Sequence, residues 1–299
     1  AVLDRNGLRP SRYYVTKDGM VVMASEVGVL PIDEANIEYK GRLQPGKMFL
    51  VDINEGRIIS DEEIKSKIST QKPYTQWIKD NQVNLKDLPS TGFQFKSDHE
   101  TVLSRQIAFG YSAEDLKFVM APMVGDATES TGSMGNDTPL AILSQKPQLL
   151  FNYFKQLFAQ VTNPAIDSIR EELVMSMEIT LGKERNLLAE SPEHCRKLKV
   201  EHPILTGHEM EKIRGLNQSD LKTAVLPILF SASEGQAGLK EALDKLCQQA
   251  SQAIEEGATI LILSDKGMDV NNVPIPSLLA TAGVHHHLLR EQTRTQVGL

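Results

Sequence analysis

The chain has 299 residues, of which 40% are hydrophobic and 24% are charged, and its formal net charge at pH 7 is −7. This composition is typical of a globular protein of about two domains, and an acidic chain without a long Lys/Arg run is a poor match for a nucleic-acid backbone. The longest apolar runs, residues 224–230 and 258–263, are too short to cross a bilayer, and two cysteines, Cys195 and Cys247, indicate a reducing compartment without a disulfide framework.

The first 60 residues are predicted to form antiparallel β-structure. Two hairpins are expected, one over residues 12–23 around Lys17-Asp18-Gly19 and one over residues 47–59 around Asn54-Glu55-Gly56. An Asp-Gly pair between β-rich runs is a strong hairpin signal. Residues 60–63, Ser-Asp-Glu-Glu, form a capping-box pattern and predict that a helix begins there.

Residues 70–105 are polar and show little apolar periodicity, so the domain junction is expected within this stretch. We place the first domain at residues 1–90, the junction at 91–105 and the second domain at 106–299.

The middle of the chain is predicted to be helical. Helices are expected to begin at Ser112, at Pro139 and at Pro147, since Ser is a good N-cap and Pro suits the first helical turn. The apolar residues of the third helix recur at helical spacing and are expected to face a core; they are Leu150, Phe151, Phe154, Leu157 and Phe158. Thr162-Asn163-Pro164 ends that helix and caps the next, and Thr206 to Glu209 is a second capping box.

The last third of the chain alternates between apolar runs and helical patterns. Runs at 224–229, 258–264 and 295–299 are separated by helices predicted over about 239–254 and 277–290. Continuous apolar runs joined by helices indicate parallel strands buried on both faces. The predicted fold class is therefore α/β, with an antiparallel β-rich N-terminal segment followed by a domain of parallel βαβ units.

Catalytic patterns are mostly absent from the sequence. Residues 132–137 are glycine-rich but lack the spacing of a phosphate-binding loop. His285-His286-His287 would point about 100° apart on a helix and so would not converge on one metal ion. Cys247 lies on the apolar stripe of the helix predicted over about 239–254. His194-Cys195 is interpreted as part of a surface loop, and Asn6-Gly7 as a turn. We expect no complete active site and no catalytic, cofactor-binding or metal-binding residue.

Several segments of the chain resemble the glutamate synthase family. Leu3-Asp4-Arg5-Asn6-Gly7-Leu8-Arg9-Pro10 and the residues up to Tyr13, together with residues 41–48, resemble the last part of a class II glutamine amidotransferase domain. Four later segments resemble the central domain of glutamate synthase: residues 132–140, 151–164, 263–268 and 275–287. The chain is thus similar to the end of the amidotransferase domain plus most of the central domain of the large subunit or single-chain form.

This resemblance implies a larger enzyme that converts glutamine and 2-oxoglutarate to two molecules of glutamate. Its glutaminase domain uses a terminal cysteine, and its barrel domain carries FMN and a 3Fe-4S cluster. Ammonia passes internally from the first site to the second. The electron donor is ferredoxin or a nicotinamide-dependent subunit, and the expected location is the cytoplasm, or the plastid stroma in a photosynthetic eukaryote.

The two ends of the chain differ from what the resemblance implies for the whole enzyme. Ala1 has neither a thiol nor a hydroxyl, so the nucleophile of the family is not at position 1. The oxyanion Asn-Gly of the family lies upstream, so Asn6-Gly7 is not assigned that role. Ala1 lies in what reads as a strand, and the chain stops at Leu299 where another strand would start. We therefore expect a fragment, inert alone, whose partners are the glutaminase core and the FMN barrel of the same parent chain.

The resemblance also suggests which residues line the ammonia passage. By motif match these are Met134, in the Gly-Ser-Met-Gly loop, and Thr162 and Asn163, in the Val-Thr-Asn-Pro turn. Asn163 is equally suited to be a helix N-cap before Pro164. The alternative for the whole chain is a stand-alone α/β scaffold or ligand-binding module, with its site at strand ends near Ser231 and Ser264-Asp265.

Overall fold

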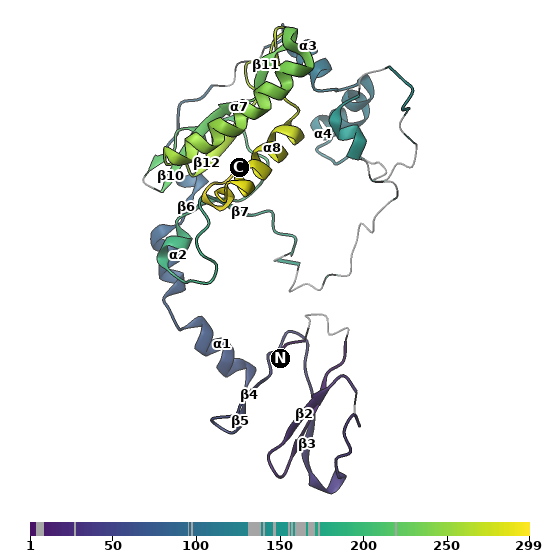
Figure 1. The fold of residues 1–299 in the computed structure, drawn as a ribbon, viewed down its shortest axis with the longest axis vertical. Helices are drawn as coiled ribbons and strands as arrows, with labels where there is room; N and C mark the ends of the chain where they lie inside the picture. The colour runs from purple at the N-terminus through teal and green to yellow at the C-terminus, as the bar shows by residue number, and fades with distance from the viewer. Residues whose placement is uncertain are drawn as a thin grey trace. The chain divides into compact units, whose positions relative to one another are not determined.

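The computed structural model describes residues 1–3, 9–26, 28–94, 96, 98–130, 139, 141–145, 148–154, 156, 158, 166, 171–172, 174–218 and 220–299. The chain forms two compact units, Ala1–Trp77 with Ile166–Leu173 and Ile78–Ala165 with Val174–Leu299. Each is described by itself below, with the labels of Figure 1.

A three-stranded antiparallel sheet forms the first unit's main β-structure. Strand β1 (Arg12–Thr16) is central and pairs with β2 (Val21–Ala24) on one side and β3 (Ile37–Arg42) on the other. Gly19 takes a φ of 86° in the β1–β2 turn, a conformation that favours glycine. The first predicted hairpin is confirmed. A short 3-10 helix, η1 (Glu34–Asn36), precedes β3.

The second predicted hairpin is also confirmed, with a shorter first strand. Strand β4 (Leu50–Asp52) pairs antiparallel with β5 (Arg57–Ile59). The buried hydrophobic side chains of this unit come from the two hairpins, from the residue after β3 and from the helix that follows β5: Val15, Leu43, Phe49, Ile59 and Ile64.

Helix α1 (Asp61–Ser69) begins where the sequence predicts, but its capping box is only half formed. The Ser60 hydroxyl accepts a hydrogen bond from the backbone N–H of Glu63, at 3.2 Å. The Glu63 carboxylate accepts two hydrogen bonds from Arg57, at 2.7 and 2.8 Å. A bidentate pair with arginine is a strong competitor for a carboxylate, so the predicted bond from Glu63 back to Ser60 is wrong. Helix α2 (Tyr74–Asn81) follows.

The second unit contains a small mixed sheet in the order β6-β8-β7. Strand β8 (Leu198–Val200) is parallel to β6 (Val83–Asn84) and antiparallel to β7 (Ile179–Leu181). Helix α6 (Gly207–Arg214) begins at the predicted capping box, which is complete: Thr206 and Glu209 each accept a hydrogen bond from the other's backbone N–H. Two short 3-10 helices, η2 (Leu85–Asp87) and η5 (Pro192–Cys195), belong to the same region.

The longest elements form an α/β layer in the last third of the chain. Strand β10 (Leu221–Pro227) runs parallel to β12 (Ile260–Ser264), and helix α7 (Gly235–Glu255) lies between them in sequence. Helix α8 (Ser277–Arg290) packs beside α7 (Figure 1). The remaining elements are β9 (Asn217–Gln218), antiparallel to β10, the antiparallel pair β11 (Leu229–Ser231) and β13 (Asn272–Pro274), and the 3-10 helices η6 (Ala232–Glu234) and η7 (Arg294–Gln296).

Two hydrophobic clusters hold this unit together. The first joins α7 and α8 to the parallel strands, and Leu246, Ala250, Ala280, Val284 and Leu288 are 0–1% exposed in it. The second packs α6 and η2 on β8 and the start of β12, with Leu198 and Val200 almost fully buried. The α/β class of the sequence prediction is therefore confirmed.

Three of the predicted elements are wrong. Among Pro139 and residues 141–145 no helix forms, and Ile142 is 88% exposed. Among the described residues of the helix expected from Pro147, the 3-10 turn η4 (Leu150–Phe154) forms in place of an α-helix, and Phe154 and Phe158 are 71% and 74% exposed. Periodicity marks the apolar face of a segment but does not supply the surface that buries it.

The third error is the strand expected over 295–299. Thr295 and Gln296 belong to η7, and only Gly298 forms a single parallel bridge, to Ile260.

The segment over residues 102–125 is largely helical and exposes apolar side chains, among them Leu103, Ile107 and Phe118. It comprises α3 (Val102–Ala108), the π-helical turn η3 (Asp115–Met120) and α4 (Ala121–Gly125). The Ser112 hydroxyl accepts a hydrogen bond from the backbone N–H of Asp115, so the predicted cap is confirmed. No helix of the described part of the chain is both long and apolar enough to cross a membrane.

Candidate functional site

The three predicted passage residues, Met134, Thr162 and Asn163, lie outside the described residues. The loop of residues 132–137 that precedes Pro139 lies outside them as well. The site must therefore be judged from the groups that the structure does place.

The strand ends near Ser264 hold a charged cluster, which we call the strand-end cluster: Glu211, Arg214, Ser264 and Lys266. The hydroxyl of Ser264, a buried residue at the end of β12, accepts hydrogen bonds from Arg214 Nη2 (3.4 Å) and from the Lys266 backbone N–H (3.3 Å). Glu211 Oε1 lies 3.4 Å from Arg214 Nε and 3.9 Å from Lys266 Nζ. Donors directed at a hydroxyl do not activate it as a nucleophile. The Glu211 carboxylate pairs with both cations, which leaves one net positive charge among these three side chains.

Ser231, the other strand-end residue of the prediction, is not brought to this cluster. It ends β11, and its hydroxyl lies 2.8 Å from that of Ser233. Among the residues placed by the structure, no hydrogen bond joins Ser231 to Ser264 or Asp265. The strand ends thus provide two separate, internally bonded groups.

The three consecutive histidines on α8 have different partners. His285 Nδ1 accepts a hydrogen bond from Arg294 Nε (2.9 Å), and His287 Nε2 lies 2.8 Å from the Ser251 hydroxyl on α7. The rings of His285 and His286 meet edge to face, with centroids 5.1 Å apart. Over the described ranges, no group of three or more His, Cys, Asp or Glu residues is placed to hold a metal ion.

The cysteines are not set up as nucleophiles. Cys247 is partly buried on α7, and burial raises the pKa of its thiol. His194, next to Cys195, has both ring nitrogens engaged: Nδ1 lies 3.1 Å from the Ser191 hydroxyl and Nε2 lies 3.0 Å from the Asn186 carbonyl oxygen. The imidazole is therefore held by the loop and is not available to Cys195 as a base.

The first residue is held in a strand-like pairing. The Ala1 amine donates to the Phe49 carbonyl (2.6 Å), and the Phe49 N–H donates to the Ala1 carbonyl (2.7 Å). Ala1 offers only a methyl group beyond its amine, so no terminal thiol or hydroxyl lies at this point.

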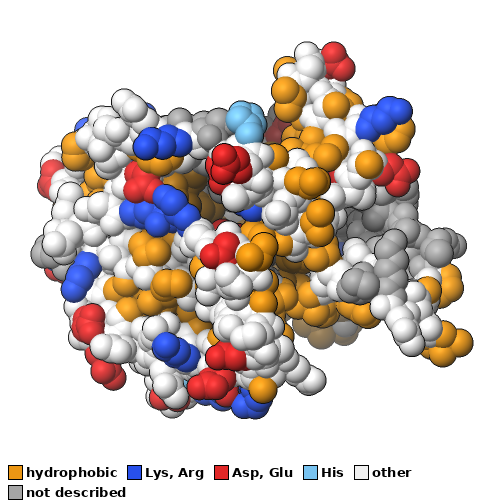
Figure 2. All heavy atoms as spheres, turned by 90° about the horizontal axis from the view of Figure 1, so that it is seen from above, with side chains coloured by type: hydrophobic (Ala, Val, Ile, Leu, Met, Phe, Trp, Pro, Cys, Tyr) orange, Lys and Arg blue, Asp and Glu red, His pale blue; other side chains and the backbone are white. Residues whose placement is uncertain are grey.

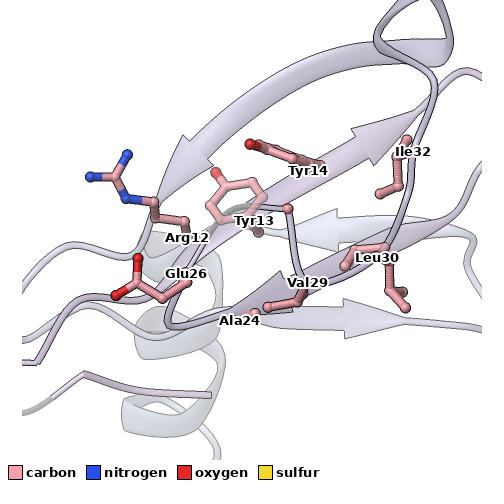
Figure 3. A pocket seen from close by; sticks show the side chains of 10 residues that line it. Arg12, Tyr13, Tyr14, Ala24, Glu26, Val29, Leu30 and Ile32 are labelled. Carbon is pink, nitrogen blue, oxygen red and sulfur yellow. The ribbon is translucent and has the colours of Figure 1, made fainter.

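The hollows of the first unit differ widely in size. Figure 3 shows a pocket between the Arg12–Tyr14 part of β1 and the chain from Ala24 to Ile32, with Arg12 and Glu26 on one side. Its volume is about 10 Å³, which is enough for one water molecule and too small for a substrate. A second, open hollow of about 880 Å³ lies over β1, β2 and the β4–β5 hairpin and is lined largely by apolar side chains.

Two hollows of about 310 Å³ each lie in the second unit. One is mixed in charge and includes Lys86, Glu201 and His202, of which Lys86 and Glu201 already pair at 3.3 Å. The other is apolar and includes Met210, Ile213 and residues 260–263. Hydrophobic side chains also lie exposed among charged ones on the face that Figure 2 shows. In the mixed hollow the Thr206 hydroxyl donates to the Glu209 carboxylate (2.8 Å), but both residues are engaged in the capping box of α6.

One further polar group, the Arg196 cluster, was not predicted from the sequence. Arg196 donates from Nε to Asn81 Oδ1 (3.2 Å) and from Nη1 to Asp220 Oδ2 (2.8 Å). Arg185 Nη2 lies 3.6 Å from Asp220 Oδ1. Asn81 and Arg196 are 115 positions apart, and no local motif marks either of them.

Comparison with known families agrees with the resemblance found in the sequence. A family model described as "Glutamate synthase central domain" matches residues 104–299, and one described as "Glutamine amidotransferases class-II" matches residues 1–77.

Similar proteins cover the whole chain. The "Glutamate synthase [NADPH] large chain" of Bacillus subtilis is 46% identical over 299 residues, which is 100% of this chain and 19% of that protein. The "Ferredoxin-dependent glutamate synthase, chloroplastic" of Spinacia oleracea is 44% identical over 98% of this chain and 18% of that protein. The "Glutamate synthase [NADH]" of Saccharomyces cerevisiae is 42% identical over 100% of this chain and 14% of that protein. The chain thus spans less than a fifth of the length of these relatives.

Proposed function

Because this chain belongs to the glutamate synthase family, we propose that it is the part of such an enzyme that joins the glutaminase site to the flavin site. In this role it lines part of an internal passage for ammonia and has no complete active site of its own. The observation that carries the proposal is the pair of adjacent family matches on one chain, amidotransferase over 1–77 and central domain over 104–299.

The whole enzyme is proposed to convert glutamine and 2-oxoglutarate to two molecules of glutamate. FMN and a 3Fe-4S cluster would supply electron transfer from parts of the polypeptide other than this chain. The matched relatives are named for NADPH, ferredoxin and NADH, so the donor varies within the family, and we propose one of these classes. We propose the cytoplasm or the plastid stroma as its location.

The domain organisation proposed is an amidotransferase end at residues 1–90, a junction at 91–105 and the central domain from residue 106. Residues 78–90, at the end of the proposed first domain, pack with the second compact unit through β6 and the buried Leu85 and Leu88, so the proposed domain boundary and the boundary of the compact units do not coincide. We also infer that β10, α7 and β12, with the parallel bridge from Ile260 to Gly298, belong to a succession of parallel βαβ units.

Met134, Thr162 and Asn163 are the proposed lining of the passage. The motif match assigns these three positions, and neutral ammonia needs hydrogen-bond partners along its path. The scaffold and ligand-binding alternatives have less support, because the strand-end cluster is internally paired and holds no activated group.

The test uses the full-length polypeptide that carries this chain. Thr162→Val and Met134→Ala remove a hydroxyl and a thioether from the proposed passage. We expect both variants to consume more glutamine per glutamate formed, because ammonia escapes before it reaches the second site. Met20→Ala, on the exposed surface of the first unit, is the control and keeps the wild-type ratio. An unchanged ratio in both passage variants would leave the chain a scaffold without a role in ammonia transfer.

A further inference from the structure

Helix α2 contains the boundary between the two compact units, which falls between Trp77 and Ile78. A short helix at such a boundary behaves either as a flexible linker or as a rigid extension of one unit. We propose that Arg196 and Asp220 form a clamp that fixes the last turn of α2 to the second unit. The end of the helix is then a fixed start of the second unit.

The chain directly after α2 is already part of the second unit. The Val83 N–H donates to the Lys197 carbonyl at 3.0 Å, and β6 continues this pairing with β8. Leu85 and Leu88 are 6% and 7% exposed in the second hydrophobic cluster. These interactions hold the chain directly after the helix, and a further contact reaches the helix itself.

Arg196 supplies that further contact, because its side chain binds two partners at once. Nε donates to Asn81 Oδ1 on the last residue of α2, and Nη1 donates to Asp220 Oδ2. The guanidinium is planar and presents its donors in a fixed fork, so the two bonds fix the direction of Asn81 relative to Asp220. A lysine ammonium carries the same charge but has no fork to span both acceptors.

Asp220 is itself anchored to the parallel sheet. Its carbonyl accepts a hydrogen bond from the Thr259 hydroxyl (3.2 Å), and that hydroxyl accepts one from the Lys222 N–H (3.1 Å) at the start of β10. Arg185 lies 3.6 Å from the other carboxylate oxygen of Asp220. A continuous path of polar contacts therefore runs from the end of α2 to the edge of β10.

The clamp is suited to a local role. The Arg196 and Asp220 side chains are 41% and 33% exposed, and partly exposed pairs contribute little to global stability because water screens them. Its loss should therefore loosen α2 without unfolding the second unit. The inference rests on the proposed function in one respect: coupling of two sites through this chain requires a defined path from the amidotransferase end into the central domain.

The first test measures hydrogen exchange in the full-length polypeptide. Arg196→Gln and Arg196→Lys are each expected to speed exchange of residues 78–84 on the order of tenfold, as expected for loss of a charge-assisted hydrogen bond. Exchange in α7 stays at the wild-type rate. The double variant Asp220→Asn/Arg196→Gln should exchange about as fast as Arg196→Gln alone, because each of the two changes disrupts the same hydrogen bond between Arg196 and Asp220. Lys240→Gln, which removes an equal charge from an 80% exposed position on α7, is the matched control.

Two results of this test would overturn the clamp. One is wild-type exchange of residues 78–84 in Arg196→Lys, which would show that charge alone suffices. The other is an equal increase in α7, which would show a general loss of stability.

The second test measures glutamine consumed per glutamate formed in the same variants. Arg196→Gln is expected to raise this ratio and Lys240→Gln to leave it unchanged. Faster exchange with an unchanged ratio would refute the coupling role of the clamp. That result would not refute the proposed ammonia passage. The passage proposal is refuted only if Thr162→Val and Met134→Ala both keep the wild-type ratio of glutamine consumed to glutamate formed.

Discussion

Two adjacent leucines on α8 give a direct test of where the core of the second unit lies. Leu288 is 0% exposed and packs in the first hydrophobic cluster with α7, whereas Leu289 is 48% exposed. Leu288→Ala should destabilise this unit by about 3 kcal/mol, because truncation removes buried methyl groups and leaves a cavity. Leu289→Ala removes the same atoms from a half-exposed position without a cavity and should cost less than about 1 kcal/mol.

The assay is urea unfolding followed by far-ultraviolet circular dichroism. Helices α7 and α8, with 21 and 14 residues, are the two longest helices of the described chain, so their loss is visible in the helical signal. With a slope of about 2 kcal/mol per molar urea, Leu288→Ala should lower the midpoint by about 1.5 M and Leu289→Ala by less than about 0.5 M. Equal shifts for the two variants, or a shift below about 0.5 M for Leu288→Ala, would refute the packing of α8 on α7.

Three further predictions concern local features. Thr206→Ala removes the N-cap of α6 and should cost about 1 kcal/mol in the same assay; no loss would show that the capping box contributes nothing. Gln292 follows α8 with a φ of 58°, so Gln292→Gly should stabilise the unit by about 0.5 to 1 kcal/mol, and a loss would contradict this reasoning. Asp61, paired with Lys65 at 2.7 Å, has its pKa lowered mainly by that bond. The ionised Asp61 carboxylate should stabilise the fold at pH values above its pKa in the unfolded chain, which is about 3.9. This stabilisation should be lost as the pH falls through the lower pKa that Asp61 has in the folded protein. Asp61→Asn should flatten the acid side of the stability profile, and an unchanged profile would exclude the effect.

Local sequence signals were sufficient where a few neighbouring residues decide the structure. The helix predicted over 277–290 has the bounds Ser277–Arg290, and Thr206 with Glu209 forms the predicted capping box. Gly19 lies in the turn of the first predicted hairpin. In each case the deciding contacts span four residues or fewer, so the sequence pattern contains them completely.

Contacts between distant residues were not predictable in this way. Glu63 was expected to bond to Ser60, but Arg57, across the β5–α1 turn, binds its carboxylate instead. Arg196 reaches Asn81 over 115 positions, and nothing local distinguishes this arginine from others. The exposed Phe154 and Phe158 show the same limit, since their spacing predicts an apolar face but not what covers it.

The proposed site was predicted only through the family resemblance. Met134, Thr162 and Asn163 were chosen by motif match, and spacing alone assigned them no chemistry. The strand-end prediction, made from the fold pattern, located a charged cluster at Ser264, but the Ser264 hydroxyl accepts hydrogen bonds there and has no base beside it. A pattern of strands and helices indicates where ligands bind in many folds and does not show that a given strand end binds one.

The central claim is that ammonia moves inside the protein along a path that this chain helps to form. The most direct measurement supplies the full-length polypeptide with glutamine labelled at its amide nitrogen, together with unlabelled ammonium in the solution. We predict that the glutamate made from 2-oxoglutarate stays almost fully labelled at its amino group as ammonium is increased, and that Thr162→Val lets unlabelled ammonium dilute this label. Dilution in the wild-type enzyme as large as in the variant would contradict the account.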